Sequence, residues 1–359
     1  QRMAIKAVGN GGCYGEGPGG AGKSYTIKLI TDILIEKKYK VYGVAMTHVA
    51  VNNINHCFPD GANTIQHFIL NKIPKIKRDI ANGNKVAMIL DEASMIQLHF
   101  WAIIANLKFL GVEFYIFGDY AGQFPPIFLE DDKWNDMDSS DFMHDLTNGL
   151  KIHFQKFRRG GDLTHFMFVI SIYPQKTDLE QALLLARKNY PIKNDLVEIT
   201  LCVSNNYRKQ VNSINNNHEQ IEKKGVYLEF VGSIKNKGQS LYIWPGLILQ
   251  SSCIERKSNK IVSYNLKNGL CYRVLDINNE IVTFIQLDNN LDNIGESMSI
   301  ATAEVPYKLL LRYALTYHKS QATTIPGSLR LAQTDHKYFT LRHLIVGLGR
   351  GPLGVDIQV

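Results

Sequence analysis

Apolar positions in the first third of the chain follow two alternating patterns. After Ser24, apolar residues return every three or four positions among charged ones, which predicts an amphipathic helix. Short apolar runs over 40–46, 86–90 and 114–117 predict buried strands, with helical stretches between them. Strands that alternate with helices indicate an α/β architecture, in which a parallel sheet is covered on both faces and ligands bind beyond the carboxyl ends of the strands.

The second half has a different pattern. A helix is predicted over 179–187 and a strand over 196–203, and residues 226–300 are rich in short strands, which suggests a small barrel. These short strands are expected at 227–231, 246–251, 272–277 and 281–287. Two asparagine-rich segments, 212–217 and 288–293, are predicted to be polar joints at domain boundaries.

Composition narrows the class of protein. A chain of 359 residues with 45% hydrophobic and 20% charged residues is typical of a soluble protein with two or more domains, and neither a signal peptide nor a membrane-spanning segment is expected. The chain begins with Gln1 rather than Met, so we expect a processed chain or a piece of a longer one. A net charge of +7 indicates a polyanionic partner. Five cysteines without a C-x-x-C pair favour a reducing, intracellular compartment and argue against a cysteine-bound metal.

Residues 17–24 fit the phosphate-binding pattern G-x-x-x-x-G-K-[ST] at every required position. Glycines allow the backbone to wrap a triphosphate with inward N–H groups at a helix N-terminus. Lys23 is expected between the β- and γ-phosphates, and Ser24 is expected to bind Mg²⁺. The predicted ATP-binding residues of this loop are Gly17, Gly19, Gly20, Ala21, Gly22, Lys23 and Ser24.

Polar residues follow the second and third apolar runs. Asp91 and Glu92 come directly after 86–90, and we expect Asp91 to hold Mg²⁺ while Glu92 deprotonates the attacking water. Gln123 lies in the segment Gly118-Asp119-Tyr120-Ala121-Gly122-Gln123-Phe124-Pro125-Pro126, where its amide can sense the γ-phosphate.

Eight segments, in order from 17 to 350, together resemble superfamily 1 helicases of the 5′-3′ branch, which includes the RecD-like, Dda-like and petite-integration-frequency (PIF) enzymes. Besides the segments above, the matching motifs are Thr47-His48-Val49-Ala50, Thr64-Ile65-Gln66-His67-Phe68, Lys156-Phe157-Arg158-Arg159, Leu315-Thr316-Tyr317-His318-Lys319-Ser320-Gln321-Ala322-Thr323 and Ile345-Val346-Gly347-Leu348-Gly349-Arg350. The compact insertions are similar to those of a minimal, viral-type member. Three positions depart from the family pattern, namely Phe124, Ala322 and Gly349.

The resemblance implies two RecA-like P-loop lobes with an SH3-like, β-rich insertion in the second. The expected domains are lobe 1A over 1–150 with a short pin-bearing element at about 69–85, lobe 2A over 151–212 and 305–359, and the insertion over 213–304. The second lobe would supply Arg158 and Arg350 to the γ-phosphate across a cleft, with Arg159 as the competitor for the role of Arg158. Gln1 is a candidate remnant of the adenine-reading motif.

The resemblance also implies a strand-binding surface. Its expected residues are Thr47, His48, Thr64 and His67 on one lobe and His318, Lys319 and Thr323 on the other. The structural alternative for His67-Phe68 is a helix cap and a core phenylalanine. The family activity is ATP-dependent, Mg²⁺-dependent unwinding of DNA in replication, repair and recombination, with replication or repair proteins as further partners and no membrane. Two alternatives stay open: an RNA-directed enzyme of the same superfamily, and a degenerate module that binds nucleic acid without unwinding it.

Overall fold

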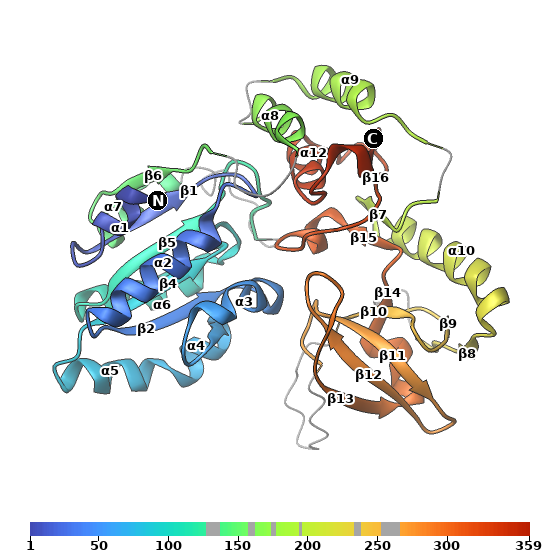
Figure 1. The fold of residues 1–359 in the computed structure, drawn as a ribbon, viewed down its shortest axis with the longest axis horizontal. Helices are drawn as coiled ribbons and strands as arrows, with labels where there is room; N and C mark the ends of the chain where they lie inside the picture. Colours follow the sequence, from blue (N-terminus) through green and yellow to red (C-terminus); the bar gives the residue numbers. More distant parts are fainter. Residues whose placement is uncertain (127–136, 157–161, 174–176, 194–195, 233–237, 253–265) are drawn as a thin grey trace. The chain divides into compact units, whose positions relative to one another are not determined.

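The computed structural model describes residues 1–126, 137–156, 162–173, 177–193, 196–232, 238–252 and 266–359. The chain forms two compact units (Figure 1): residues 1–182 with 340–353, and residues 183–339 with 354–359. These units are groups of residues in mutual contact, and the domain boundaries predicted after 150, 212 and 304 stay predictions. Among the described residues, no helix has both the length and the apolar character needed to cross a bilayer.

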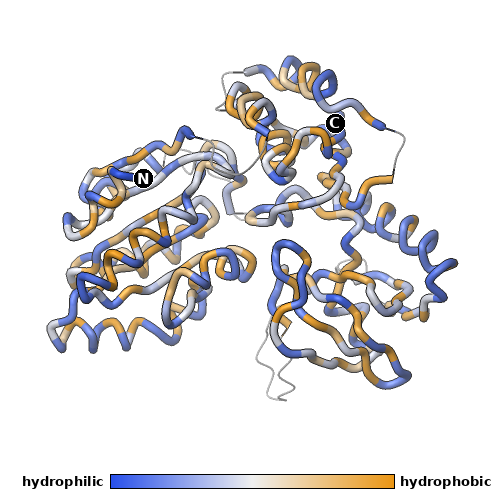
Figure 2. Tube along the Cα trace, viewed as in Figure 1, coloured by the Kyte–Doolittle hydropathy of each residue, from blue (hydrophilic) through white to orange (hydrophobic). Residues whose placement is uncertain are grey.

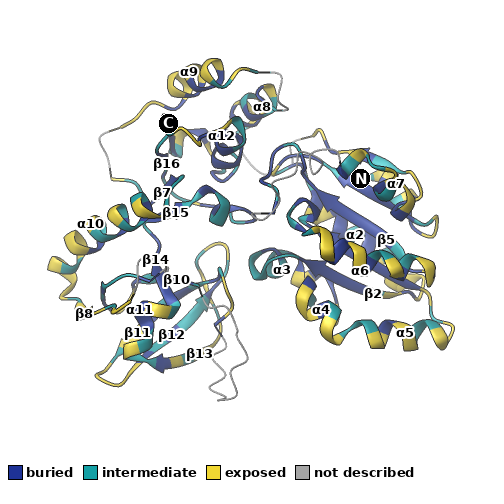
Figure 3. Cartoon of the chain, turned by 180° about the vertical axis from the view of Figure 1, so that it is seen from behind, coloured by how far each residue is buried: buried dark blue, intermediate teal, exposed yellow. Residues whose placement is uncertain are grey.

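The first unit contains a six-stranded sheet in the order β3-β2-β4-β5-β1-β6, and all its pairs are parallel. Its strands are β1 (Gly12–Glu16), β2 (Lys40–Ala45), β3 (Ala62–Thr64), β4 (Val86–Asp91), β5 (Glu113–Gly118) and β6 (Lys151–His153). The strands predicted at 40–46, 86–90 and 114–117 are confirmed. The central strands are buried along their length (Figure 3), as their continuous apolar runs require.

Helices cover both faces of this sheet. The helices of this unit are α1 (Arg2–Lys6), α2 (Lys23–Glu36), α3 (His48–Ile54), α4 (Ile65–Asn71), α5 (Ile73–Ala81), α6 (Leu98–Phe109), α7 (Asp141–Leu146), α8 (Leu163–Ser171) and α12 (Leu341–Leu348), with 3-10 turns at η1 (Asn55–Cys57) and η2 (Ala93–Met95). One face carries a core in which Phe68 and Trp101 pack with Met88. Because successive side chains of a strand alternate, Ala87 and Ile89 lie on the opposite face, where α2 contacts β2 and β4.

The second unit contains a four-stranded parallel sheet in the order β15-β7-β16-β17. Its strands are β7 (Ile199–Cys202), β15 (Ala314–Thr316), β16 (Leu329–Leu331) and β17 (Ile357–Gln358). The helices near it in sequence are α9 (Leu179–Asn189), α10 (Asn205–Lys223), η5 (Tyr317–Ser320) and η6 (Gly354–Asp356). Parallel sheets in both units confirm the predicted α/β fold with two RecA-like lobes. The predicted strand over 196–203 is shorter than expected and begins at Ile199.

The β-rich region forms a five-stranded antiparallel sheet, β13-β12-β11-β10-β14, and a separate pair, β8-β9. The elements are β8 (Val226–Leu228), β9 (Leu241–Ile243), β10 (Ile248–Ser251), β11 (Cys271–Ile277), β12 (Ile281–Leu287), β13 (Asn293–Ala301), η4 (Thr302–Glu304), α11 (Val305–Lys308) and β14 (Leu309–Leu311). Segment 288–293 is mostly the turn between β12 and β13, and the Asp288 carboxylate accepts hydrogen bonds from backbone N–H groups of that turn. It is therefore a hairpin turn within one sheet rather than a boundary between domains.

The other segment predicted as a joint, 212–217, is helical rather than a loop, because α10 runs through it without interruption. Figure 2 shows α10 as mostly hydrophilic, which is why the segment resembles a loop. Asn212 and Asn216 are nevertheless buried. Asn212 exchanges two hydrogen bonds with the backbone of Ala314 (2.7 and 3.3 Å), and Asn216 does the same with Tyr242 (2.7 and 2.9 Å). These asparagines fasten the helix to the backbones of β15 and β9.

Candidate functional site

The phosphate-binding loop joins the end of β1 to the start of α2 in the first unit. Gly20 and Gly22 have φ angles of 82° and 90°, a left-handed conformation that favours glycine. Gly17 is required for another reason, because a Cβ atom there would lie 2.6 Å from the backbone oxygen of Phe154. The loop therefore has the tight backbone that its glycines predicted.

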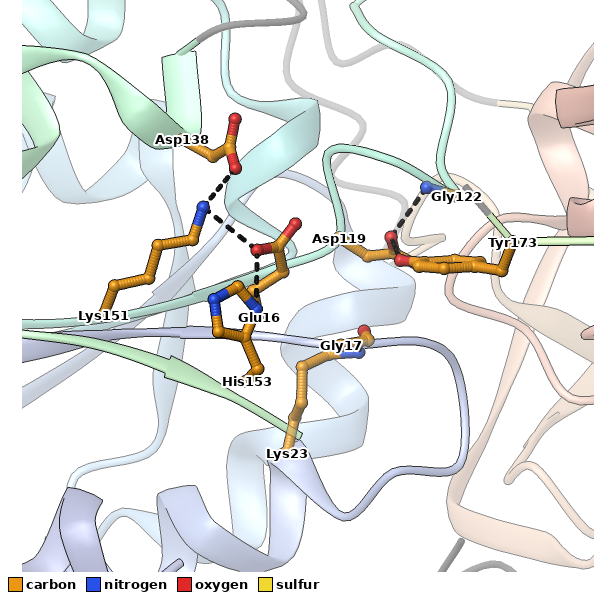
Figure 4. Close-up of polar contacts among 9 residues, drawn as sticks. All are labelled: Glu16, Gly17, Lys23, Asp119, Gly122, Asp138, Lys151, His153 and Tyr173. Atoms are coloured by element: carbon orange, nitrogen blue, oxygen red, sulfur yellow. Dashed lines mark hydrogen bonds and ion pairs between the residues drawn. The ribbon is translucent and has the colours of Figure 1, made fainter. Parts of the chain in front are cut away.

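Lys23 begins α2 and is buried within the loop. Its Nζ donates hydrogen bonds to the backbone oxygens of Gly17 (2.5 Å) and Pro18 (3.1 Å). Figure 4 shows the side chain reaching back towards Gly17. Ser24 follows on the exposed side of the first helical turn. The ammonium thus lies among the backbone groups that would surround a phosphate.

A charged cluster precedes the loop (Figure 4). The Glu16 carboxylate pairs with Lys151 Nζ at 3.1 Å and with His153 Nδ1 at 3.3 Å, and Lys151 also pairs with Asp138 at 2.5 Å. These contacts tie the edge strand β6 to the end of β1, so they hold the base of the loop in place.

Asp91 and Glu92 lie at the carboxyl end of β4, as predicted. Burial, and then the neighbouring Glu92 carboxylate, raise the pKa of Asp91 to about 7, against an opposing effect of Lys23. Glu92 has a φ angle of 53°, a left-handed conformation that costs a non-glycine residue about 1–2 kcal/mol. Strain of this kind is typical of functional sites.

Gln123 connects this acid to the next strand. Its Nε2 donates a 2.5 Å hydrogen bond to the Glu92 carboxylate, and its Oε1 accepts one of 2.5 Å from Ser94 Oγ. The amide is therefore oriented by two partners, one of which is the Glu92 carboxylate itself. The position of Ser94 in the segment after β4 was apparent from the sequence, but its role as a partner of Gln123 was not.

Asp119 and Tyr173 form a second contact that sequence reasoning missed (Figure 4). The buried Asp119 carboxylate accepts hydrogen bonds from the Tyr173 hydroxyl and from the Gly122 N–H, the latter at 2.7 Å. Burial raises the pKa of Asp119, while Lys23, Tyr173 and the Gly122 N–H oppose that shift. Gly122 has no room for a side chain, since a Cβ atom there would lie 2.5 Å from the Tyr173 ring. This contact fixes the turn that immediately precedes Gln123.

Arg350 follows α12 and lies in the same compact unit as the phosphate-binding loop. A Cβ atom placed on Gly19 would lie 3.8 Å from a terminal nitrogen of the Arg350 guanidinium. The side chain is buried, and its Nε donates a 3.1 Å hydrogen bond to the backbone oxygen of Val346. The structure therefore brings Arg350 to the loop. Arg158 and its competitor Arg159 lie outside the described residues.

The predicted strand-binding residues of the first unit cluster at the carboxyl edge of the sheet. Thr47 is the N-cap of α3 and accepts a hydrogen bond from the Ala50 N–H (3.1 Å), and Thr64 is the N-cap of α4 and accepts one from the His67 N–H (3.4 Å). The preceding strands are paired, with Ala45 opposite Thr64. His48 follows Thr47 in the first turn of α3. Two helix N-termini therefore lie near each other, a favourable setting for phosphate groups.

The structural alternative for the second motif also holds in part, because Phe68 is fully buried in the core. The His67 side chain is exposed, and Thr64 is the residue that caps the helix. The basic residues of the element at 69–85 lie on or next to α5, a helix with Ile76 buried, and Lys75 pairs with Asp60 at 3.4 Å. A pin function for this element stays a prediction.

In the second unit, His318 and Lys319 lie in η5, and Thr316 caps this turn by accepting a 3.4 Å hydrogen bond from the Lys319 N–H. Burial lowers the pKa of His318. Thr323 follows the turn and is half-buried. At the other end of the chain, Gln1 is the N-cap of α1 and is half-buried, and its role in reading adenine stays a prediction.

Comparisons with known proteins bear on this arrangement. Residues 1–129 match a family model described as an AAA domain. A search of curated proteins finds no match. Among solved structures, the Pif1 helicase from Candida albicans has a TM-score of 0.62 at 20% identity, with 100% of this chain and 93% of that chain covered. A Bacteroides Pif1 bound to single-stranded DNA has a TM-score of 0.65 at 18% identity, covering 99% and 90%. A Bacteroides Pif1 in complex with ADP-AlF4 has a TM-score of 0.56 at 17% identity, covering 99% and 90%.

The chain has the Pif1 helicase fold. Two of the positions that depart from the family sequence pattern, Phe124 and Ala322, have distinctive surroundings or backbone conformations in this structure. The Phe124 ring packs edge-on against His343 of α12, with centroids 4.6 Å apart, so this residue links the turn after β5 to the helix that precedes Arg350. Ala322 has a φ angle of 61°, which is in the left-handed region that favours glycine. Glycine is the residue expected at this position from the resemblance to superfamily 1 helicases. Gly349 is the C-cap of α12 and has an ordinary φ of −70°.

Proposed function

We propose that this chain is an ATP-driven helicase that moves 5′ to 3′ along single-stranded DNA and unwinds duplex ahead of it. The observation that carries the proposal is that the Arg350 guanidinium lies beside the phosphate-binding loop, whose Lys23 interacts electrostatically with Asp91, the neighbour of Glu92. A phosphoryl-transfer site needs these parts: a cation at the phosphates, an acid for the water, and an arginine for the transition-state charge. The similarity of the fold to Pif1 helicases supports a motor that acts on DNA.

Mg²⁺ fits the residues at this site. Asp91 is buried with a raised pKa, and a divalent cation beside it would offset the cost of holding its charge away from water. Ser24 and Asp91 would hold the metal, whose charge would neutralise the phosphate oxygens. Glu92 would orient and deprotonate the water, and Gln123 would hold Glu92 in position.

Single-stranded DNA is the proposed partner. One of the compared Pif1 structures holds it, and the capped helix N-termini after Thr47 and Thr64 offer N–H groups to its phosphates. Replication, repair and recombination are the proposed settings, with an intracellular location and with proteins of those processes as further partners. RNA is the second candidate because phosphate contacts alone do not select the sugar.

Lys23→Ala tests the assignment of the active site. We expect ATP hydrolysis to fall by about 10³-fold or more, because the cation at the β- and γ-phosphates is lost, while strand affinity stays within a few-fold of wild type. ATPase assays with DNA and RNA strands, followed by unwinding of 5′-tailed and 3′-tailed duplexes, measure substrate and direction.

Each outcome has a clear meaning. Persistent hydrolysis in Lys23→Ala means that the active site is misassigned. Stimulation by RNA alone overturns the choice of DNA, and strand binding by the wild-type protein without hydrolysis favours the degenerate module. Preferential unwinding of 3′-tailed substrates overturns the proposed direction.

A further inference from the structure

A cavity of about 630 Å³ lies at the edge of the first unit opposite the phosphate-binding loop. Its lining includes Gly9, Lys37, Tyr39 and Lys85, all of which precede the first residues of β1, β2 or β4. The lining is therefore at the amino edge of the parallel sheet. A strand of six residues spans roughly 20 Å, so the cavity is well separated from the nucleotide site.

Three lysines from three separate segments converge on this cavity: Lys6 at the end of α1, Lys37 after α2, and Lys85 before β4. All three are exposed, and within the described ranges none of them pairs with a carboxylate. Lys37 Nζ donates to the backbone oxygen of Val8 at 3.3 Å, and Lys85 Nζ lies 5.6 Å from the Tyr39 ring centroid. Like charges gathered at one cavity repel one another and attract an anion.

The carboxylate bonded to this lining, Glu113, already has other partners. It accepts hydrogen bonds from the Tyr39 hydroxyl at 2.8 Å, the Tyr115 hydroxyl at 2.7 Å and the Gly9 N–H at 3.3 Å. These bonds build the wall of the cavity and hold Tyr39 and Gly9 in place. The three lysines thus line a cavity whose wall is held by hydrogen bonds, and their ammonium groups can interact with a ligand.

We propose that this cavity binds the phosphodiester backbone of nucleic acid, as a second contact in addition to the strand-binding residues at the opposite edge of the sheet. The exposed cations Lys38 and Lys40 adjoin the lining in sequence and extend the positive charge beyond the cavity, which suits a ligand longer than a single phosphate group. The inference rests on the proposed function in that the ligand is the nucleic acid on which the motor acts.

The test compares two triple variants that remove the same charge. Lys6→Gln, Lys37→Gln and Lys85→Gln together change the cavity, whereas Lys188→Gln, Lys223→Gln and Lys267→Gln change exposed lysines of the second unit. Affinity for single-stranded DNA is measured without nucleotide across a series of salt concentrations. Affinity falls as salt rises, and each lost phosphate contact makes the slope of log affinity against log salt shallower by about 0.7. The slope of the cavity variant should therefore be shallower than that of wild type by about 2, and its affinity at moderate salt should be roughly tenfold lower.

The matched control should keep its slope. Equal losses in both variants, or no loss in the cavity variant, would overturn the proposal, since only a local contact distinguishes them. Thermal unfolding midpoints check that both variants fold, and the single variants Lys37→Gln and Lys85→Gln give the same readout with smaller perturbation.

A second arm separates nucleic acid from free polyphosphate. Binding of inorganic tripolyphosphate is measured with the same variants, and a cavity variant that loses tripolyphosphate but keeps its full affinity for DNA would overturn the nucleic-acid ligand. Failure of the proposed motor function is judged separately, by ATP hydrolysis of the wild-type chain, because the binding measurements contain no nucleotide.

Discussion

At Asp91, burial acts against the negative charge that its proposed metal-binding role needs. Its pKa is raised from an ordinary value of 3.8 to about 7, so the folded protein is disfavoured wherever Asp91 is ionised. The contribution of protonated Asp91 to the free energy of unfolding is fully present below pH 3.8, and it is lost as the pH rises towards 7. The ionised carboxylate that metal binding would need is therefore the form that destabilises the folded protein.

Asp91→Asn should make this conflict visible. We expect the variant to be more stable than wild type at pH 8 by roughly 1–4 kcal/mol, the upper bound being the cost of the full pKa difference, and to lose that advantage near pH 4. Mg²⁺-dependent hydrolysis should be lost at every pH. Urea unfolding at the two pH values measures the stability, and a variant that is less stable at pH 8 would contradict the burial argument.

Tyr173 donates a hydrogen bond to Asp119 in the turn that precedes Gln123, so we expect it to influence the proposed hydrolysis. Removing the hydroxyl in Tyr173→Phe takes a hydrogen bond from a buried carboxylate, which costs its ionised form roughly 1.5 kcal/mol and raises the pKa of Asp119 further. Activity that needs ionised Asp119 should then be lost at a higher pH than in wild type. We expect the acid limb of the ATPase profile to move up by about one pH unit.

Tyr25→Phe is the matched control for that substitution, because Tyr25 is 60% exposed on the same unit. Its profile should overlay that of wild type. An unchanged acid limb in Tyr173→Phe would mean that the tyrosine has only a packing role.

Helix α10 shows how a polar helix is held to two strands. Asn212→Ala should destabilise the protein by about 2–4 kcal/mol, because it removes two hydrogen bonds and leaves the backbone N–H and C=O of Ala314 buried without them. Asn217→Ala, an exposed position on the same helix, should change stability by less than about 0.5 kcal/mol. Denaturant unfolding compares the two, and equal effects would show that the hydrogen bonds of Asn212 contribute nothing.

The same helix marks where sequence reasoning fails. Hydrophobic runs identify β2, β4 and β5 because both faces of a parallel strand are buried, and these predictions are confirmed. The asparagines of α10 resemble a loop because their burial is satisfied by strand backbones distant in sequence. The nine-residue strand β13 was not predicted as an element, since it is mostly polar and exposed and gains its structure from pairing with β12.

The residues of the candidate site also divide into those with a local sequence signal and those supplied by distant segments. Residues whose chemistry is local, such as the glycines and Lys23 of the loop and Asp91 at the end of β4, were predictable from motif and position. Partners supplied by distant segments were not. Tyr173 has no local signal, and its contact with Asp119 depends on how the chain folds between them.

For the whole molecule, the presence of Arg350 beside the phosphate-binding loop suggests how binding of nucleotide is linked to binding of the DNA strand. If the two binding events are coupled, each ligand must change the affinity of the protein for the other by the same factor, typically about 5–150-fold. Phe124 and His343 connect the turn that carries Gln123 to α12, and Arg350 follows that helix, so the nucleotide site and this helix share one set of contacts. The Arg350 guanidinium is therefore the side chain that we expect to transmit the presence of bound phosphate to α12.

Arg350→Ala should lower turnover by about 10³-fold and bring the coupling factor close to 1, with strand affinity in the absence of nucleotide as the reference. Two titrations measure the factor: strand affinity with and without a non-hydrolysable ATP analogue, and analogue affinity with and without strand. Arg187→Ala, at an exposed arginine of the second unit, should keep the wild-type factor. A variant that hydrolyses slowly but keeps full coupling would assign Arg350 to transition-state stabilisation alone, and another side chain would then have to link nucleotide to strand.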